Sequence, residues 1–352
     1  MPTLAVAGGA SPSLGRAIIT ALLSSTQSTQ WNAIILSRNS KIPLWLRAID
    51  QDGTRIQIRA VDYLSTRSLA TALEGVHTVV SVTSAIDGTQ AQIQMNLLNA
   101  SVQAGCKRFA PAQWAFGPKG WENIGFIKEE GEPVWNECLK NKDKIETAKF
   151  NIGSFMNYIG LGIYTASAAP SDDETMLQQL RAGGGYMAGE DAAIQGLQRQ
   201  GDLKDGSGAF LLGMKNAIAE LPVREDGQWP RISMISMRDV GRFLVASLHL
   251  QKWEEDMTMV GDTLTVHELL AHAEAVTGKE FAVDLIKKAD QQKKLGELAS
   301  ENFMAMAWTE FKLAYIRDLD DEVVLRPVVN RLCPTVKPMS AREYMEIYWT
   351  TT

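Results

Sequence analysis

The first 160 residues alternate short β-branched runs with stretches of helical periodicity, and this alternation constrains the fold more than any other feature. The expected strands are 3–7, 33–37, 56–61, 78–82, 108–111 and 149–154. The expected helices between them are 15–24, 42–50, 65–73, 90–104 and 134–141. A strand–helix–strand crossover is right-handed and leaves its two strands parallel, and parallel sheets carry helices on both faces. The sequence therefore predicts an α/β fold with a doubly wound parallel sheet.

The pattern changes after residue 165, where a polar, helix-poor region runs from about 168 to 230. Beyond it we expect a returning strand, two helices and a last helix-rich stretch, over 232–235, 238–248, 265–277 and 287–315. Thr265 and Glu268 have the spacing of a capping box. We expect one lobe over residues 1–165, to which 232–250 returns, and a smaller C-terminal lobe over 166–231 and 251–352.

Composition and charge argue against several function classes. The formal net charge is −6 and no basic stripe is present, which disfavours a nucleic-acid groove. No apolar run approaches the ~20 residues of a membrane span. The three cysteines lie far apart without CxxC spacing and there are four histidines, so neither a zinc site nor a disulfide framework is expected. We expect a soluble cytoplasmic protein with no metal and no nucleic-acid or membrane partner.

The stretch Gly9-Ala-Ser-Pro-Ser-Leu-Gly15 connects the first expected strand to the first expected helix. A tight turn here would point backbone N–H groups and the positive end of a helix at a phosphate. Pro12 replaces the middle glycine of such turns and lacks an N–H donor, whereas Ser11 and Ser13 offer hydroxyl groups. The alternative is an ordinary strand–turn–helix without a ligand. The residues expected to hold the phosphates are Gly9, Ser11, Pro12, Ser13, Leu14 and Gly15.

Polar residues also follow the next three expected strands. At the end of the second strand an acidic residue would hold the ribose of NAD, whereas an arginine accommodates the extra phosphate of NADP. Arg38 stands there; the alternative is a solvated surface arginine. The expected cofactor-binding residues at these strand ends are Ser37, Arg38, Asn39, Asp62, Tyr63, Thr83 and Ser84. In this order they predict a site for NADP(H).

Several strings stand in the order found in a known group, namely GASPSLG (9–15), LSRN (36–39), VDY (61–63), LEGVHTVVS (73–81), AGCKRFAPAQW (104–114), NIGSFMNYIG (151–160) and MRDVGRFLVASL (237–248). From roughly residue 3 to 280 the sequence resembles the NmrA-like and isoflavone-reductase-like branch of the atypical short-chain dehydrogenases. The resemblance implies a Rossmann-like lobe, a smaller substrate lobe and NADP(H) as cofactor. Reductases of this group act on C=C, C=N or benzylic ether carbons of aromatic or alkaloid-like metabolites, while other members bind the nucleotide as redox sensors.

The sequence departs from this group at the expected reaction site. Pro111-Ala-Gln-Trp114 lacks the serine and the acid of the group's pattern, and Lys128 is the nearest candidate for its lysine. None of the seven tyrosines has a lysine four residues later, which disfavours the Tyr-x-x-x-Lys mechanism. Lys128 is therefore the expected catalytic residue, binding cofactor and polarising or protonating the substrate; the alternative is an exposed lysine in a charged loop. Gln113 is expected to contact the cofactor.

A small hydrophobic molecule is the expected substrate. The residues expected to bind it are Trp114, Phe155, Met156, Asn157 and Tyr158, with packing between the lobes as the alternative role for the last four. The first functional hypothesis is an NADPH-dependent reductase of a C=C or C=N bond in a bulky natural product such as an alkaloid precursor, with a variant that also steers cyclisation. The second is a non-catalytic NADP(H) sensor that binds a protein partner.

Overall fold

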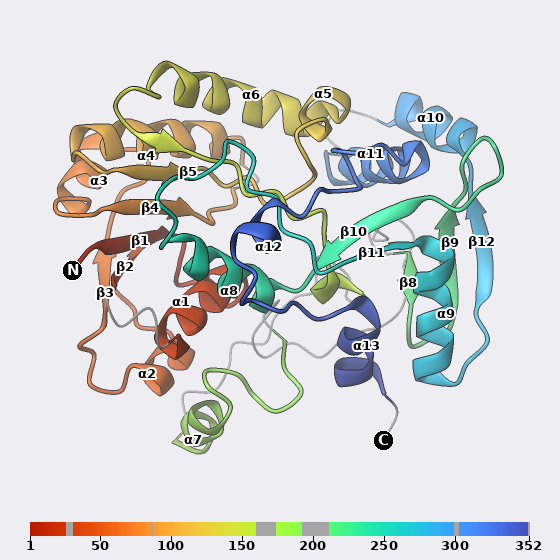
Figure 1. Cartoon of the computed structure of the whole chain (residues 1–352), viewed down its shortest axis with the longest axis horizontal. Coiled ribbons are helices and arrows are strands. Elements are labelled where there is room, and N and C mark those ends of the chain that lie inside the picture. Colours follow the sequence, from red (N-terminus) through yellow and green to blue (C-terminus); the bar gives the residue numbers. More distant parts are fainter. Residues whose placement is uncertain (26–30, 86, 160–173, 192–210, 299–302, 351–352) are drawn as a thin grey trace.

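The computed structural model describes the chain outside residues 26–30, 86, 160–173, 192–210, 299–302 and 351–352. Six parallel strands form a sheet of order β3-β2-β1-β4-β5-β6 (Figure 1). The strands are β1 Thr3–Ala7, β2 Asn32–Ser37, β3 Ile56–Ala60, β4 Thr78–Ser81, β5 Arg108–Ala110 and β6 Glu146–Thr147. The chain order reverses between β1 and β4, as in doubly wound folds. This arrangement confirms the predicted fold class.

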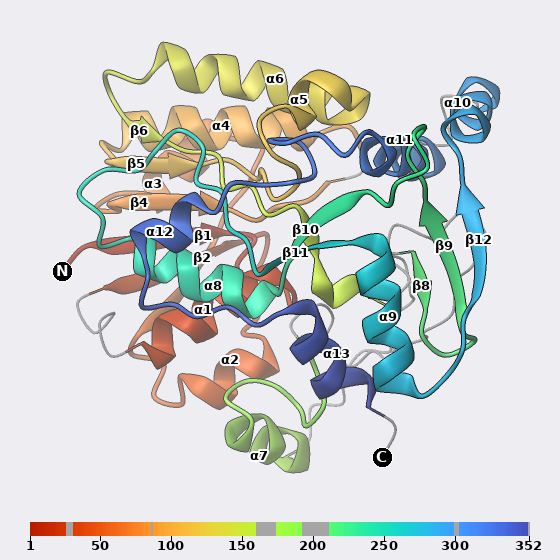
Figure 2. The same ribbon diagram turned by 45° about the vertical axis from the view of Figure 1, so that its right-hand side comes forward.

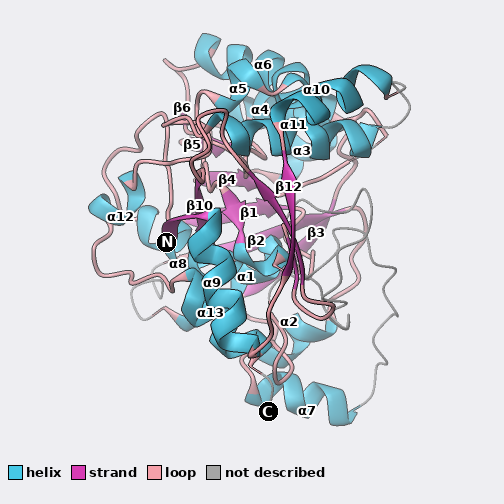
Figure 3. Cartoon of the chain, turned by 90° about the vertical axis from the view of Figure 1, so that its right-hand side faces the viewer, coloured by secondary structure: helices cyan, strands magenta, loops and turns pink. Residues whose placement is uncertain are grey.

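Helices lie on both sides of these strands (Figure 3). One side carries α1 Leu14–Ser24, α2 Leu44–Ile49 and α8 Met237–Ser247, and the other carries α3 Thr66–Ala72, α4 Gln90–Gln103 and α6 Gly125–Lys140 (Figure 2). In β1, Leu4 and Val6 pack with the first set of helices, whereas Ala5 and Ala7 pack with the second. All four are fully buried, so β1 is apolar on both faces, as a covered parallel strand requires.

The prediction that residues 149–154 form the sixth strand of the sheet is wrong. The sixth strand is the shorter β6, and the chain after it is paired elsewhere: Met257 N–H donates to the Lys149 carbonyl at 2.8 Å and Met259 N–H to that of Asn151 at 2.9 Å. Phe150 and Ile152 still bury their side chains. The segment is buried throughout, as a strand in the sheet would be, but its hydrogen-bonding partner is the loop before β11 rather than the six-stranded sheet.

Helix α6 begins nine residues before the expected start at 134. Pro133 lies inside the helix. Because proline lacks an N–H and usually stands at the start of a helix, the sequence predicts a helix only after this residue. The carboxylate of Glu310 accepts hydrogen bonds from the backbone N–H groups of Gly125, at 3.2 Å, and Phe126, at 3.3 Å. The first turn of α6 is therefore capped by a residue almost two hundred positions later in the chain.

Two further sheets, each of three strands, lie within the described residues. Their orders are β11-β10-β7 and β12-β9-β8, with β7 Ser154–Phe155, β8 Leu212–Gly213, β9 Ile218–Pro222, β10 Arg231–Ile235, β11 Asp262–Thr265 and β12 Ala282–Ile286. The strand expected over 232–235 is β10, and it pairs with β7 and β11 instead of joining the six-stranded sheet. The helix after it, α8, does return and packs on α1.

The remaining helices are α5 Gly120–Asn123, α7 Glu174–Ala182, α9 Val266–Thr277, α10 Lys288–Glu297, α11 Phe303–Arg317, α12 Val328–Leu332 and α13 Ala341–Trp349, with a 3₁₀ turn over Met156–Tyr158. Within 168–230, where few helices are expected, the described residues contain the helix α7, which packs on α2. The predicted capping box of α9 is confirmed by reciprocal hydrogen bonds between Thr265 and Glu268. None of the helices in the described ranges is both long and apolar enough to cross a bilayer; the cytoplasmic location stays a prediction.

Helices α1 and α8 approach so closely that one position accepts only glycine. A Cβ on Gly241 would lie 2.7 Å from the Ala17 carbonyl carbon and closer still to its oxygen. We expect Gly241→Ala to lower the free energy of unfolding by about 1–3 kcal/mol, because the two backbones must separate. Urea unfolding measures this change.

Gly296, near the end of α10, is the matched control because a Cβ there meets no atom within 4 Å. The same glycine-to-alanine change should raise stability there by up to ~1 kcal/mol through helix propensity alone. Equal effects at the two positions would show that the α1–α8 contact has no special need for glycine.

Candidate functional site

The turn between β1 and α1 requires glycine at two positions, for different steric reasons. Gly8 has φ +79°, and a Cβ on it would lie 3.2 Å from the Thr83 nitrogen just beyond β4. A Cβ on Gly15 would lie 2.8 Å from the Gly9 carbonyl oxygen, so the first turn of α1 rests directly on the loop backbone. Gly8 precedes the expected glycine-rich stretch and was missed; its signal is the doubled glycine after the strand.

The start of α1 lacks the usual protein partners for its positive end. The N-cap residue, Ser13, makes no side-chain cap hydrogen bond, and the first turn holds no acidic residue. Its hydroxyl instead pairs with that of Ser11 at 2.6 Å. Pro12 lies between them, with its carbonyl accepting a hydrogen bond from Arg16. The positive end of α1 thus has neither a capping side chain nor an acidic residue to offset it. It lies beside a turn whose glycines leave the backbone without side chains. Both are features of an anion site.

The ends of β2 and β3 lie next to this turn. Arg38 and Asn39 are exposed, directly after the half-buried Ser37. The Tyr63 hydroxyl donates to the Leu36 carbonyl at 2.7 Å and accepts from the Gly8 N–H at 2.8 Å, and burial raises its pKa to about 12. Tyr63 therefore acts as a positioning residue between the turn and β2. Asp62 is exposed and accepts a hydrogen bond from the Leu64 N–H.

A pocket of about 390 Å³ opens at the carboxyl ends of β1, β4 and β5. The start of α1, the residues after β4 and β5, one face of α6 and the middle of α11 line it. Eight of the residues expected in the site meet in this lining: Ser13, Leu14, Thr83, Ser84, Gln113, Trp114, Phe155 and Tyr158. This crevice, beside the reversal of strand order, is where doubly wound folds bind ligands.

One wall of the pocket is a network of amides and hydroxyls. Gln94 donates to the Thr83 hydroxyl at 2.7 Å and to the Ser81 hydroxyl at 3.1 Å, and its carbonyl accepts from the Ala112 N–H. Gln113 is only 7% exposed, and its Nε2 has no hydrogen-bond partner. A buried donor left unpaired is costly, so this atom marks a place for a ligand acceptor. Gln94 was missed, because a glutamine within an amphipathic helix carries no distinguishing pattern.

Another wall of the pocket is aromatic, and its side chains also line a second, adjacent chamber of about 220 Å³. Trp114 donates its Nε1–H to the Ser81 carbonyl at 2.8 Å, which fixes the indole at the boundary. The two chambers share the aromatic side chains of Trp114, Phe155, Tyr158, Trp308 and Phe311. Trp308 and Phe311 come from α11, where the sequence showed only a helix-rich stretch.

Two residues expected to bind substrate do not line this pocket. Met156 is fully buried in a hydrophobic core cluster that includes Met234 and Leu264. Asn157 is 1% exposed and accepts a hydrogen bond from the Met237 N–H at 2.8 Å, which fixes the start of α8. Both side chains therefore make packing or positioning contacts here, and a substrate-binding role for either stays a prediction.

Lys128 is also absent from the pocket lining. It lies on α6 with an exposed side chain, whereas Ile127, Glu130, Gly131 and Val134 form the face of α6 that lines the pocket. Glu130 is half-buried, and burial, with Glu129 beside it, raises the pKa of its carboxyl group. The catalytic role of Lys128 stays a prediction.

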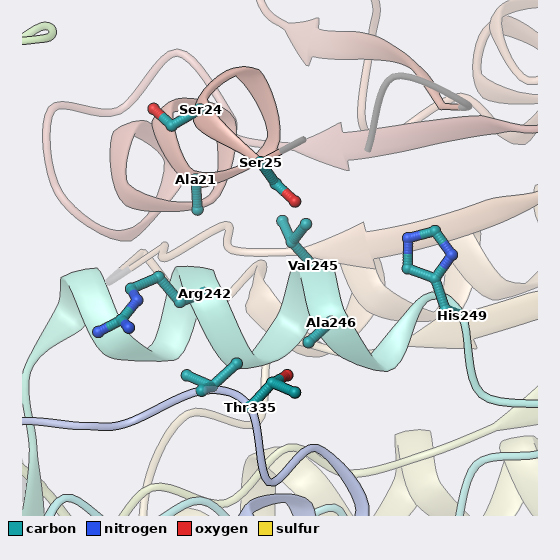
Figure 4. Close-up of a pocket in the computed structure, with 9 residues that line it drawn as sticks. Ala21, Ser24, Ser25, Arg242, Val245, Ala246, His249 and Thr335 are labelled. Carbon is teal, nitrogen blue, oxygen red and sulfur yellow. The ribbon is translucent and has the colours of Figure 1, made fainter. Parts of the chain in front are cut away.

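A second pocket of about 390 Å³ lies between α1 and α8, as Figure 4 shows. Its charged residue, Arg242, is bonded to the Asp239 carboxylate at 2.6 Å and to the Lys337 carbonyl at 2.9 Å. None of the residues expected in the cofactor or substrate site lines it. Across the described residues no cluster of metal-ligating side chains is found.

Known proteins resemble this chain in both sequence and fold. The NmrA-like family model matches residues 2–148. Oxidoreductase BOA1 of Botryotinia fuckeliana is 24% identical over 286 residues, which cover 80% of this chain and 78% of that protein. The structure of AtPrR2 with NADP+ and (+)pinoresinol superposes with a TM-score of 0.64 at 17% identity, covering 99% of this chain and 98% of that one.

A structure from the work on pinoresinol-lariciresinol and phenylcoumaran benzylic ether reductases and their relationship to isoflavone reductases gives a TM-score of 0.67 at 15% identity. It covers 99% of this chain and 100% of that one. These comparisons confirm the resemblance inferred from the sequence: residues 2–148 match the NmrA-like family model, and the chain as a whole is similar in fold to the pinoresinol and phenylcoumaran benzylic ether reductase structures.

Proposed function

We propose that this chain is an NADP(H)-dependent reductase of a bulky, aromatic small molecule. The observation that carries the proposal is a pair of adjacent pockets: one reaches the β1–α1 turn at Ser13 and Leu14, and the other shares its aromatic side chains. The relative with NADP+ and (+)pinoresinol supports both ligand classes.

The residues of the chain fit a dinucleotide. The turn from Gly9 to Gly15 would hold the pyrophosphate at the start of α1, and Arg38 with Ser37 and Asn39 would hold the 2′-phosphate. The unpaired Nε2 of Gln113 would donate to an amide or substrate oxygen in the pocket. When bound, NADPH supplies two electrons and a hydrogen at its nicotinamide ring; the chain orients the ring and excludes water.

The proposed substrate is reduced at a C=C or C=N bond. The aromatic chamber favours a flat, bulky ligand, since Phe155 and Tyr158 meet edge to face with centroids 5.8 Å apart, and Trp308 packs on Phe311 at 5.4 Å. A role in natural-product biosynthesis, with or without cyclisation, extends this proposal. The alternative, a non-catalytic sensor with a protein partner, would be favoured by a blocked space beside the nucleotide; the adjacent aromatic chamber of about 220 Å³ supports the reductase.

Anaerobic calorimetric titration with NADPH tests the cofactor part. We expect one nucleotide to bind per chain. In a separate turnover assay, adding planar aromatic imines or enones should oxidise NADPH and lower its absorbance. No nucleotide binding would refute the proposal. Binding of NADPH together with a protein partner but without turnover of any aromatic acceptor would favour the sensor.

A further inference from the structure

The charge of the pocket is as informative as its shape. Glu130 is the one residue with a formal charge among the described residues that line it. No described residue donates a hydrogen bond to its carboxylate or pairs with it; the neighbouring charge that acts on it is that of Glu129, which is also negative. The pocket therefore contains a partly desolvated acid for which the described protein provides no cation.

Aromatic side chains line the same pocket as this acid. Phe126 lies one helical turn before Glu130 on the same side of α6 and packs on Phe311 of α11, with centroids 5.2 Å apart. Trp308, Phe155 and Tyr158 complete the wall. Aromatic faces attract cations, and the attraction increases when the site is desolvated. A carboxylate and several aromatic rings around one cavity are thus complementary to an organic cation, and a neutral ligand would leave the acid unpaired.

Resting on the proposed function, we propose that Glu130 is a specificity-determining residue that makes the pocket select an aromatic ligand with a positively charged nitrogen. The charge of the ligand offsets that of Glu130, while its rings pack on Trp114, Trp308 and Phe311. Of the two bonds considered for the substrate, this favours C=N, because that nitrogen carries a positive charge when protonated or alkylated and a C=C carbon does not.

The raised pKa of Glu130 is consistent with this site. Burial and Glu129 disfavour the ionised form in the empty pocket. A bound cation favours that form and removes the penalty. A positively charged ligand would therefore be bound more tightly because of this carboxylate.

The test compares two probes of the same shape, phenyltrimethylammonium and tert-butylbenzene, by calorimetry on the full chain, with and without NADP+. We expect the natural chain to bind the ammonium probe about tenfold or more tightly than the neutral one. Glu130→Gln should lose about tenfold in ammonium affinity and keep its affinity for tert-butylbenzene. Glu129→Gln, the same charge change on the exposed side of α6, should leave both affinities unchanged.

Equal or weaker binding of the ammonium probe by the natural chain would overturn the proposal, as would no binding of either probe. An equal loss in the Glu129 and Glu130 variants would do the same, because it would reflect net charge alone. If Glu130→Gln does not fold, Glu130→Asp replaces it, with an intermediate loss expected because the shorter acid lies farther from the ligand. The titrations without NADP+ report on Glu130 even if the nucleotide fails to bind, so failure of the cofactor proposal stays distinguishable.

Discussion

Replacing Arg38 with alanine should weaken NADPH binding by about 10- to 100-fold and leave NADH binding nearly unchanged. The two nucleotides differ by the 2′-phosphate, and Arg38 is exposed at the end of β2, where the ribose of a dinucleotide is expected. A charge-assisted hydrogen bond contributes about 1.5–3 kcal/mol, which corresponds to this range. Calorimetric titration of both nucleotides at one ionic strength measures the effect, because salt weakens such contacts.

Arg331→Ala is the matched control. Arg331 is also exposed, lies on α12 away from the nucleotide turn, and carries the same charge. It should leave both nucleotide affinities unchanged. Equal losses of NADPH and NADH affinity in the Arg38 variant would mean that Arg38 does not bind the 2′-phosphate. An unchanged NADPH affinity would mean that the 2′-phosphate site is not at the end of β2.

The half of the pocket beside the β1–α1 turn was predictable because its determinants are local. Strands β1 to β5 are short apolar runs, and the residues that matter follow directly after them in the sequence. Carboxyl ends of parallel strands meet at one edge of the sheet, so Ser13, Thr83 and Gln113 come together without any knowledge of the loops. The pattern of six alternating units was sufficient to bring them to one place.

The aromatic half of the pocket was less predictable because it is made by residues far apart in the chain. Trp308 and Phe311 reach the pocket on α11, and Glu310 from the same helix caps the start of α6. The sequence does not reveal the contact between Glu310 and the start of α6, so the segment before Pro133 is predicted to be a charged loop. A loop has no helical face to which its residues could be assigned. Once it is a helix, positions 127, 130, 131 and 134 share one face. Lys128 then faces solvent, and Glu130, two residues later, faces the pocket.

Gly15→Ala should raise the dissociation constant for NADPH by about 100-fold or more, the largest loss expected from a single methyl group in this chain. The added Cβ would lie 2.8 Å from the Gly9 carbonyl oxygen and 2.9 Å from the Gly9 Cα and carbonyl carbon. These are backbone atoms, so the loop must move away from α1. Such a movement separates the loop N–H groups from those of the helix, and both are needed to hold one pyrophosphate.

The change also overpacks a buried position, so a stability loss of about 1–3 kcal/mol is expected. Affinity must therefore be measured where urea unfolding shows that the variant is fully native. Gly241→Ala is the control for this point, because it overpacks the other side of α1 against Ala17 and leaves the turn intact. If both variants lose stability but only Gly15→Ala loses NADPH, the cause is the geometry of the turn. If Gly15→Ala binds NADPH as the natural chain does, the start of α1 is not the phosphate site, since a cradle that needs this contact could not tolerate the methyl group.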